Sequence, residues 1–201
     1  PAVVPQLRTI TLGGAAAGVG IEATSFREGL VHETLTAIDV LTGTGEVVTC
    51  RPDNEHADLF HGFPNSYGTL GYALRLDIEL EPVTPQICLR HVRFQSAVDL
   101  AAAVAGIVAD RRWDGERVDY VDGTVFAADE MYLTLGRYAE ELGACSDYTG
   151  SQIYYQSIRR RTADRLTTLA YLWRWDTDWF WCSRALGAQH PLVRRLWPRS
   201  K

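Results

Sequence analysis

The sequence lacks any long apolar run. No stretch approaches the roughly 18 uninterrupted apolar residues of a membrane-spanning helix. A leader that is first charged and then apolar is also missing at the start. We therefore expect a cytoplasmic protein that is soluble, or peripheral at the inner face of the membrane.

Cysteine is scarce, and histidine is not clustered. Four cysteines are spread along the chain without a C-x-x-C spacing: Cys50, Cys88, Cys145 and Cys182. This spacing excludes a zinc knuckle or a disulfide framework and predicts buried thiols in a reducing cytosol. The five histidines likewise lack a metal-ligand spacing, so we expect no bound metal: His32, His56, His61, His91 and His190.

Lysine is almost absent. Lys201 is the only lysine among the 20 lysine and arginine residues. Many arginines and alanines suggest a GC-rich bacterial genome. Without lysines and exposed aromatic residues interleaved on a sheet, nucleic-acid binding is not expected. Residues 1–150 carry 10 basic against 22 acidic side chains, whereas residues 151–201 carry 10 against 3. The basic tail can meet phosphate, anionic lipid or the chain's own acidic part.

The first eighty residues alternate between β-prone runs and glycine-rich turns. Thr9 to Leu12 predicts a short strand that runs into the glycine-rich loop Gly13–Gly20. Two further β-prone runs, Leu35 to Leu41 and Glu46 to Thr49, are joined by turn residues and predict a hairpin.

Two more elements are expected before Pro82. Asn54 to Phe63 predicts a helix with Asp53 as its cap. The regular alternation of apolar and charged residues then predicts a half-exposed strand that ends at Pro82, with four residues on its apolar face: Leu74, Leu76, Ile78 and Leu80.

The pattern restarts after Pro82. We expect a strand at Ile87 to Phe94, a helix from Ser96 to Asp110, and strands near Arg117 to Val121 and Met131 to Leu135. The last fifty residues have a helical and irregular pattern. With a hinge near residues 81–85, the sequence predicts an α+β chain with domains at 1–83 and 84–201.

The glycine-rich run has two interpretations. Without a Cβ, glycine lets backbone N–H groups approach an anion such as a diphosphate. Such runs often serve only as turns, however. A Rossmann fold is disfavoured, because a hairpin follows where G-x-G-x-x-G would require a crossover helix and a parallel strand.

Several motifs in residues 9–82 resemble the vanillyl-alcohol-oxidase, or PCMH-type, FAD-binding family. The nearest branch is similar to the delta(24)-sterol reductases. The resemblance depends on these motifs and their order: Thr11-Leu12-Gly13-Gly14, Gly18-Val19-Gly20-Ile21-Glu22-Ala23-Thr24-Ser25, Gly29-Leu30-Val31-His32, Asp58-Leu59-Phe60 and Gly68-Thr69-Leu70-Gly71.

The resemblance implies the second subdomain of a PCMH-type FAD-binding domain followed by part of an α+β substrate domain. The family's first FAD subdomain is not in this sequence, so we expect a partial segment. It would be completed by the rest of its polypeptide or by a second copy. The implied contacts with non-covalent FAD are Thr11, Gly13, Gly14, Gly18, Gly20, Ile21, Thr24, Ser25, Gly29, Leu30, Val31, Leu70, Gly71 and Tyr72.

The implied reaction is reduction of a carbon–carbon double bond in a lipid, with electrons passing from NAD(P)H through the flavin. A positioned acid must supply the proton. Tyr154, Tyr155 and Arg160 are the candidates, although tyrosine pairs usually pack and arginine runs are usually solvated. Two other functions stay open: a flavin oxidase or dehydrogenase of an alcohol or sugar acid, and a non-catalytic interaction module.

The segment Tyr171–Trp181 holds four of the six tryptophans. Its basic surroundings suit a lipid-facing surface, where an indole ring is half wet and half apolar. Ordinary core packing or a subunit contact is the alternative.

Overall fold

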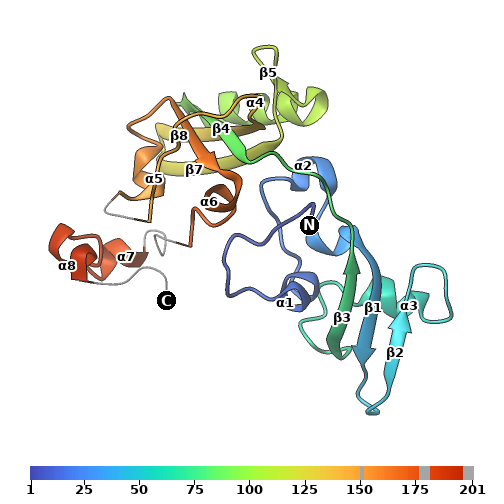
Figure 1. The fold of residues 1–201 in the computed structure, drawn as a ribbon. Coiled ribbons are helices and arrows are strands. Elements are labelled where there is room, and N and C mark those ends of the chain that lie inside the picture. The colour runs from blue at the N-terminus through green and yellow to red at the C-terminus, as the bar shows by residue number, and fades with distance from the viewer. Residues whose placement is uncertain (150–151, 177–181, 197–201) are drawn as a thin grey trace. The chain divides into compact units, whose positions relative to one another are not determined.

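The structure is a computed structural model that describes residues 1–149, 152–176 and 182–196. It divides into two compact units, unit 1 (Pro1–Pro82) and unit 2 (Val83–Lys201). Both combine antiparallel sheets with flanking helices, so the predicted α+β class is confirmed (Figure 1). The assignment of the two units as FAD-binding and substrate domains stays a prediction.

Unit 1 is built on a three-stranded antiparallel sheet with the order β2-β1-β3. Its elements are α1 (Leu12–Ala17), α2 (Ser25–Glu28), the 3-10 helix η1 (Val31–Thr34), β1 (Leu35–Leu41), β2 (Val47–Cys50), α3 (Ala57–Gly62) and β3 (Tyr72–Ile78). The predicted hairpin is confirmed, because β1 and β2 pair in antiparallel register.

The predicted strand at residues 9–12 is wrong. Helix α1 begins at Leu12 and contains the first five of the eight residues of the glycine-rich run. The Thr11 hydroxyl accepts a hydrogen bond from the Gly14 N–H at 3.0 Å and so caps this helix. The cap and the three alanines at the end of α1 favour a helix despite the two glycines between them, and they outweigh the short β-prone run of Thr9 to Leu12.

The helix predicted at 54–63 begins later than expected, at Ala57. Asp53 is not its cap. The Asn54 side chain instead accepts hydrogen bonds from the N–H groups of Arg51 and His56, and it donates to the Thr49 carbonyl. These local bonds hold the preceding residues in a turn.

Strand β3 contains a register shift that the alternation of its sequence does not reveal. Asp39 pairs with Arg75, but the next residue, Val40, pairs with Ala73, so one residue of β3 is extra. Ala73 and Leu76 therefore both face the apolar core of unit 1. Leu74 is left 58% exposed, and Leu80, which follows the strand, is 73% exposed. The prediction that both belong to one apolar face is wrong.

Unit 2 is built on a four-stranded antiparallel sheet with the order β7-β8-β4-β9, and a small hairpin, β5–β6, accompanies it. Its strands are β4 (Gln86–Phe94), β5 (Arg112–Trp113), β6 (Glu116–Arg117), β7 (Tyr120–Ala127), β8 (Glu130–Tyr138) and β9 (Ala163–Thr167). Its helices are α4 (Ala97–Asp110), α5 (Tyr154–Ser157), α6 (Thr168–Leu172), α7 (Cys182–Ala185) and α8 (Pro191–Leu196).

The predicted strand at 87–94, the helix after Ser96 and the strand at 131–135 are confirmed. The run at 117–121 is divided between β6 and β7. Strand β9 was not expected in a tail that was interpreted as helical. Helix α4 packs against β4, β5 and β8. Within the described residues, no helix is long and apolar enough to span a bilayer.

Candidate functional site

Three separate segments of unit 1 that carry the implied FAD contacts lie together. An ideal Cβ on Gly13 would be 3.5 Å from the Cβ of Ala73. The Tyr67 N–H donates to the Ala17 carbonyl at 3.2 Å, and the Val31 N–H donates to the Gly20 carbonyl at 3.2 Å. Helix α1 and the loop after it therefore contact both the segment 29–31 and the segment 67–73. We call this group of residues the glycine patch.

The surface of the glycine patch is more apolar than charged. Thr11 and Gly14 are exposed at the start of α1, and Ile21 is exposed after its end. Leu70, which precedes β3, and Tyr72, which is the first residue of β3, are also exposed. Exposed aliphatic and aromatic side chains beside backbone N–H groups suit a ligand that has both a flat ring and a polar chain.

Several of the predicted glycines are required by the chain's own packing. A Cβ on Gly71, where φ is +130°, would be 2.4 Å from the Leu41 carbonyl oxygen. A Cβ on Gly20 would be 3.0 Å from Val31, and one on Gly29 would be 2.6 Å from a Glu33 carboxylate oxygen. Folding alone therefore explains glycine at Gly71 and at Gly29, where φ is +77°, whereas a side chain at Gly20 would require Val31 to shift slightly. Gly13, by contrast, has only ordinary contacts at 3.5 Å or more.

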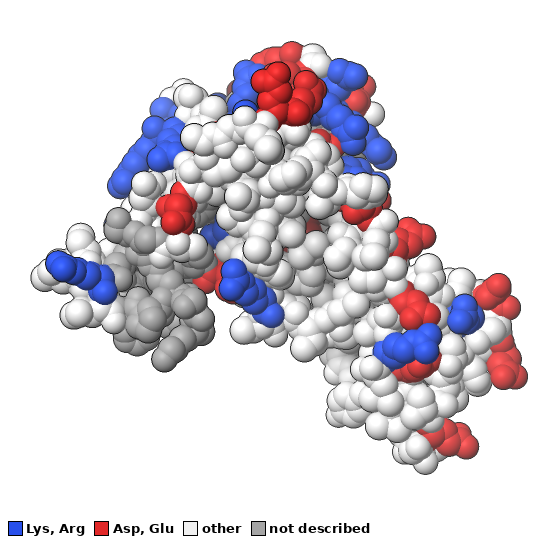
Figure 2. Space-filling view, in the orientation of Figure 1, with Lys and Arg blue, Asp and Glu red and all other residues white. Residues whose placement is uncertain are grey.

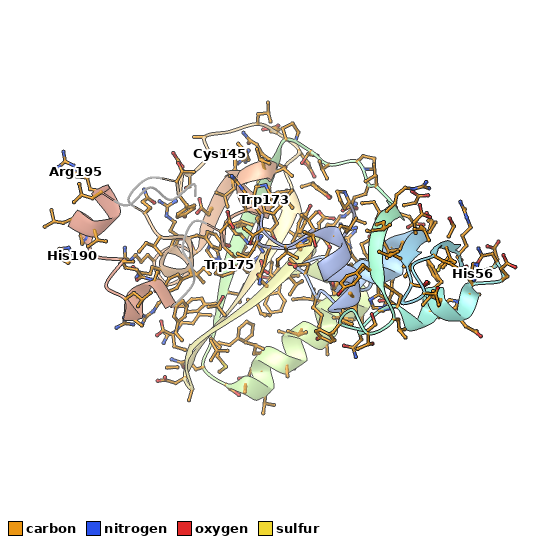
Figure 3. All side chains as sticks on the ribbon, turned by 90° about the horizontal axis from the view of Figure 1, so that it is seen from below. His56, Cys145, Trp173, Trp175, His190 and Arg195 are labelled. Atoms are coloured by element: carbon orange, nitrogen blue, oxygen red, sulfur yellow. The ribbon has the colours of Figure 1, made fainter. Side chains whose placement is uncertain are left out.

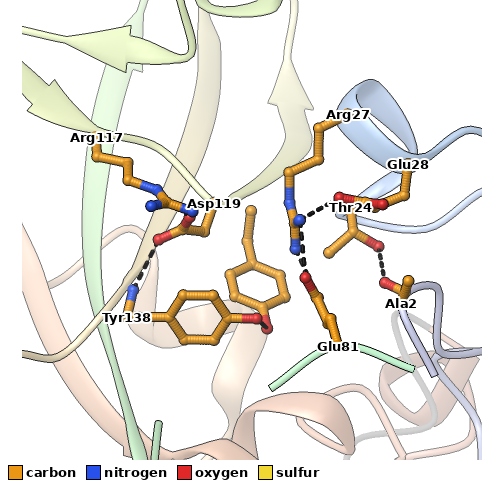
Figure 4. A network of polar contacts seen from close by, with 9 residues as sticks. Ala2, Thr24, Arg27, Glu28, Glu81, Arg117, Asp119 and Tyr138 are labelled. Carbon is orange, nitrogen blue, oxygen red and sulfur yellow. Dashed lines mark hydrogen bonds and ion pairs between the residues drawn. The ribbon is translucent and has the colours of Figure 1, made fainter. Parts of the chain in front are cut away.

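Two predicted hydroxyl groups make hydrogen bonds within unit 1. The Thr24 hydroxyl is buried and donates to the Ala2 carbonyl at 2.8 Å (Figure 4). The Ser25 hydroxyl accepts from the Glu22 N–H at 2.9 Å. Arg27 next to them binds Glu81 through two hydrogen bonds, of 2.7 and 2.9 Å. The loop around α2 is therefore held by internal polar contacts, and the roles of Thr24 and Ser25 toward a cofactor stay predictions.

Two buried polar atoms within the described part of unit 1 have no hydrogen-bond partner: Ser66 Oγ and His32 Nδ1. Ser66 precedes the turn that contacts α1, and His32 lies in η1 directly after Val31. Buried polar atoms are normally satisfied by protein, water or ligand. Each is the direct sequence neighbour of a segment of the glycine patch, so the residues present fit a polar ligand such as FAD at this position.

One face of the unit 2 sheet is unusually polar. In the strand register, Asp122 of β7 pairs with Thr134 of β8, and Thr134 pairs with His91 of β4. The same face carries Asp164 of β9, because Asp164 pairs with Leu89, two residues before His91. We call it the polar sheet face. Its titratable groups come from three strands that are far apart in sequence.

Arg174 covers this face and is 5% exposed. It forms an ion pair with Asp122, and its guanidinium lies 3.9 Å from the ring centroid of Tyr171. Burial is the largest single effect and would lower the pKa of Arg174, but Asp122, Tyr171 and Tyr154 together outweigh burial and raise this pKa. The guanidinium therefore stays charged, and it holds Asp122 and the aromatic rings in place.

Two buried polar groups near Arg174 have no hydrogen-bond partner among the described residues: His91 Nε2 and the Tyr154 hydroxyl. The other ring nitrogen of His91 lies 2.8 Å from the Thr134 hydroxyl. Burial lowers the pKa of His91 to about 4. Burial also raises the pKa of Tyr154 well above its ordinary value. At neutral pH the imidazole is therefore uncharged, and the phenol keeps its proton.

Beside them, Tyr148 donates a hydrogen bond to Asp164. Burial and this hydrogen bond raise the pKa of Tyr148 to about 12. Asp164 also accepts from Ser146 at 2.5 Å and from Arg161 at 3.1 Å. This carboxylate is therefore fully engaged in holding the segment before α5 against the sheet.

The three predicted catalytic residues are not in one place. Tyr155 and Arg160 line the same pocket, of about 480 Å³, together with Phe126 and Arg184. The Tyr155 hydroxyl is 3.0 Å from Gln189 Oε1. Tyr154, although adjacent in sequence, is fully buried and packs edge-on against Trp175 with ring centroids 5.0 Å apart. Their catalytic roles stay predictions.

The sequence interpretation missed the buried residues of the polar sheet face. The signal for Arg174 was its position between two tryptophans, in a segment for which a lipid-facing surface and ordinary core packing or a subunit contact were both left open. Trp175 is in fact buried and Trp173 half-buried, and both lie among other side chains of unit 2 (Figure 3). Trp179 and Trp181 lie outside the described residues. Cys50 is buried as expected, whereas Cys88 and Cys145 are only half-buried.

Comparison with known proteins gives sequence relatives and a structural neighbour. The chain is 32% identical over 145 residues to the delta(24)-sterol reductase of Pisum sativum and 31% identical over 139 residues to that of Homo sapiens. These matches cover 70% and 69% of the chain and 26% of each relative. The chain therefore spans about a quarter of the length of these relatives.

A third relative, cytokinin dehydrogenase 5 of Oryza sativa subsp. japonica, is 32% identical over 122 residues, which cover 61% of the chain and 22% of that protein. The solved structure of a carbohydrate oxidase from Microdochium nivale superposes with a TM-score of 0.57 at 14% identity, over 85% of this chain and 36% of that one. No family model matches the chain. The predicted resemblance to the vanillyl-alcohol-oxidase, or PCMH-type, FAD oxidoreductases, and to the delta(24)-sterol reductases within them, is confirmed.

Proposed function

We propose that these residues are part of an FAD-dependent oxidoreductase that reduces a carbon–carbon double bond of a lipid. The substrate class is a sterol side chain or an unsaturated or methylene-branched fatty acyl chain, and NAD(P)H is the electron donor. The main support is the similarity to delta(24)-sterol reductases over 70% of the chain. The glycine patch, where the implied cofactor segments meet, agrees with this proposal.

The glycine patch would hold FAD without a covalent bond. Backbone groups of Gly13 and Gly14 would approach its diphosphate, and Ile21, Leu70 and Tyr72 would contact its apolar parts. The flavin supplies hydride transfer when it is bound. Ser66 Oγ and His32 Nδ1, which are buried without partners, would be satisfied by its polar groups.

Unit 2 would bind the substrate and hold the proton that the reaction needs. Tyr155 and Arg160 line an accessible pocket and can orient a substrate. Tyr154 keeps its proton at neutral pH, because burial raises the pKa of its hydroxyl. The neighbouring Arg174 fixes the ring environment of Tyr154, with the guanidinium 5.9 Å from the ring centroid. We also propose that the basic tail, residues 151–201, makes a peripheral contact with the membrane surface.

A second candidate is oxidation of an alcohol or sugar acid by the same cofactor. It is favoured by the similarity to a cytokinin dehydrogenase and by the fold shared with a carbohydrate oxidase. The two reactions differ in the direction of hydride transfer. Anaerobic mixing of the complete polypeptide with NADPH distinguishes them. Bleaching of the flavin absorbance supports the reductase, whereas peroxide formed from an alcohol without such bleaching contradicts it.

The binding of FAD can be tested at Gly13. A methyl group there meets only ordinary contacts, so Gly13→Ala preserves the fold. The added Cβ would lie beside Ala73, at the junction of α1 and the segment 67–73, and we expect it to narrow this junction and lower FAD affinity by at least tenfold. Flavin retained after gel filtration of the complete polypeptide measures this effect.

Gly43→Ala is the matched control, because a Cβ at Gly43 in the hairpin loop has nothing within 4 Å. It should retain FAD as the unchanged protein does. Equal retention of FAD by both variants, or an unchanged protein that is colourless and does not take up added FAD, would overturn the proposal.

A further inference from the structure

A groove of about 440 Å³ lies on the face of the unit 2 sheet opposite to the polar sheet face. It is bounded by β4, β8 and β9 and by the β5–β6 hairpin. In the strand register Cys88 pairs with both Arg137 and Arg165, so the three side chains form one row across the sheet. Arg90, two residues along β4, lies on the same side. We call this the arginine groove.

The charges of the arginine groove are only partly balanced. Arg90 forms an ion pair with Asp114 at 2.6 Å in which both side chains are about half exposed. Arg137 has Glu116 at 3.9 Å, which is at the limit of an ion pair. Figure 2 shows basic side chains gathered with acidic ones at the end of the unit that carries β5. Exposed pairs of this kind exchange partners at little cost.

Among the arginines of the groove, Arg165 has the positive charge that is least balanced by acidic groups. Its guanidinium donates to Gln86 Oε1 at 3.2 Å and to the Glu141 carbonyl, and both of these acceptors are neutral. These bonds hold the guanidinium in a defined position beside Gly143. A fixed guanidinium with neutral partners is suited to bind the oxygen atoms of a carboxylate or phosphate.

Trp113 supplies a second, independent observation. Its side chain lines the groove, and its indole Nε1 is buried without a hydrogen-bond partner among the described residues. The ring packs edge-on against Phe94, with centroids 6.2 Å apart, so it is held in place. An indole N–H only donates, so the missing partner must be an acceptor.

We propose that the arginine groove binds an organic anion through a phosphate or carboxylate group. Arg165 and Arg137 contact the anionic oxygens, and the Trp113 indole N–H donates one further hydrogen bond. A water molecule occupies about 30 Å³ of liquid, so the groove also has room for the organic body that carries the anionic group. The site lies within unit 2 and does not depend on the proposed flavin chemistry.

The test follows the indole N–H resonance of Trp113 in ¹H–¹⁵N spectra of the ¹⁵N-labelled chain. Trp113→Phe, which keeps an aromatic ring, assigns the resonance. AMP serves as the phosphate probe and citrate as the carboxylate probe. We expect a saturable shift of the resonance with at least one probe. Saturation by AMP alone assigns a phosphate ligand, and saturation by citrate alone assigns a carboxylate ligand.

Arg165→Gln should weaken the binding of the effective probe by at least tenfold, and Arg137→Gln by a smaller factor. Arg93→Gln is the matched control, because Arg93 lies on the same strand but on the opposite face, and it should change affinity less than twofold. Thermal unfolding verifies that each variant is folded. The proposal is overturned if neither probe shifts the resonance, or if Arg93→Gln weakens binding as much as Arg165→Gln.

Discussion

The two units differ in what they bury. The core of unit 1 is made of small and apolar side chains such as Ala16, Ile38 and Phe63, and its one nearly buried charge is the Arg27 side chain, which is paired with Glu81. Unit 2 buries an arginine, a histidine and several tyrosines against one face of its sheet. Unit 1 therefore depends mainly on close backbone packing, whereas the sheet face of unit 2 depends on matched charges. We expect an added methyl group to destabilise unit 1 and the loss of a charge to destabilise unit 2.

The largest effect is expected at Arg174. Replacing it by methionine leaves Asp122 without its partner, and the side chain of Asp122 is only 16% exposed. Removing one member of a buried pair costs about 3–5 kcal/mol. Arg174→Met should therefore lower the free energy of unfolding by about this amount in urea titrations.

The control is the double variant Arg174→Met with Asp122→Asn, which also removes the stranded charge. It should recover more than half of the loss. If the double variant is as unstable as the single one, packing of Arg174 against the aromatic rings outweighs the ion pair.

His91 tests the same unit through pH. Burial depresses its pKa to about 4, from 6.5 for a free histidine. The unfolded chain therefore takes up a proton that the folded chain refuses. The contribution of His91 to the free energy of unfolding is complete above pH 6.5. It decreases as the pH falls from 6.5 to 4, and it does not change further below pH 4. This difference in pKa corresponds to about 3 kcal/mol.

Urea titrations between pH 7 and 4 measure this dependence, and His91→Gln should flatten it. Asp164, Arg161 and Asp122 also act on His91, so their charges must be preserved in the variant. An equally steep loss of stability in His91→Gln would assign the pH dependence to other groups.

In unit 1 the corresponding weak point is Gly71. Its φ of +130° and the close Leu41 carbonyl leave no room for a side chain. Gly71→Ala should cost at least about 2 kcal/mol of stability. Gly45→Ala is a control for backbone strain alone, because Gly45 has φ +85° but nothing within 4 Å, and it should cost about 1 kcal/mol. Equal losses in thermal unfolding would show that the contact with β1 does not matter.

The smallest effect compares the helix caps of the two units. The Thr11 hydroxyl accepts from Gly14 N at 3.0 Å, whereas the Ser96 hydroxyl accepts from Asp99 N at 3.4 Å. Thr11→Ala should cost about 1 kcal/mol, which is typical of a cap, and Ser96→Ala should cost less. Unfolding monitored by circular dichroism would contradict this order if Ser96→Ala were the more damaging change.

Local sequence patterns predicted much of the fold. The β-prone runs located β1, β2 and β4, and Ser96 correctly marked the start of α4. The alternation of apolar and charged residues assigned Leu74 to the wrong face of its strand. One extra residue in a β-bulge changes which face the neighbouring side chains occupy, and a bulge depends on pairing with another strand. The sequence pattern also failed at Thr11, where a β-branched residue serves as a helix cap.

The family resemblance and the positions of the glycine patch were accessible from sequence, because its motifs are contiguous and glycine-rich. The polar sheet face was not. His91, Asp122 and Asp164 lie on three strands, and only the strand order brings them to one side. The sequence left open whether the segment that contains Arg174 faces lipid or packs in the core, since no local pattern distinguishes a buried arginine from an exposed one.

The extra residue in β3 allows one short strand to contribute side chains both to the core and to the surface. Ala73 and Leu76 pack into the core, whereas Tyr72 and Leu74 remain at the surface of the same strand. Mutations at the two surface positions can therefore change the exposed surface of β3 while the interior stays intact. Related chains are then free to diversify at this edge without losing the ability to fold.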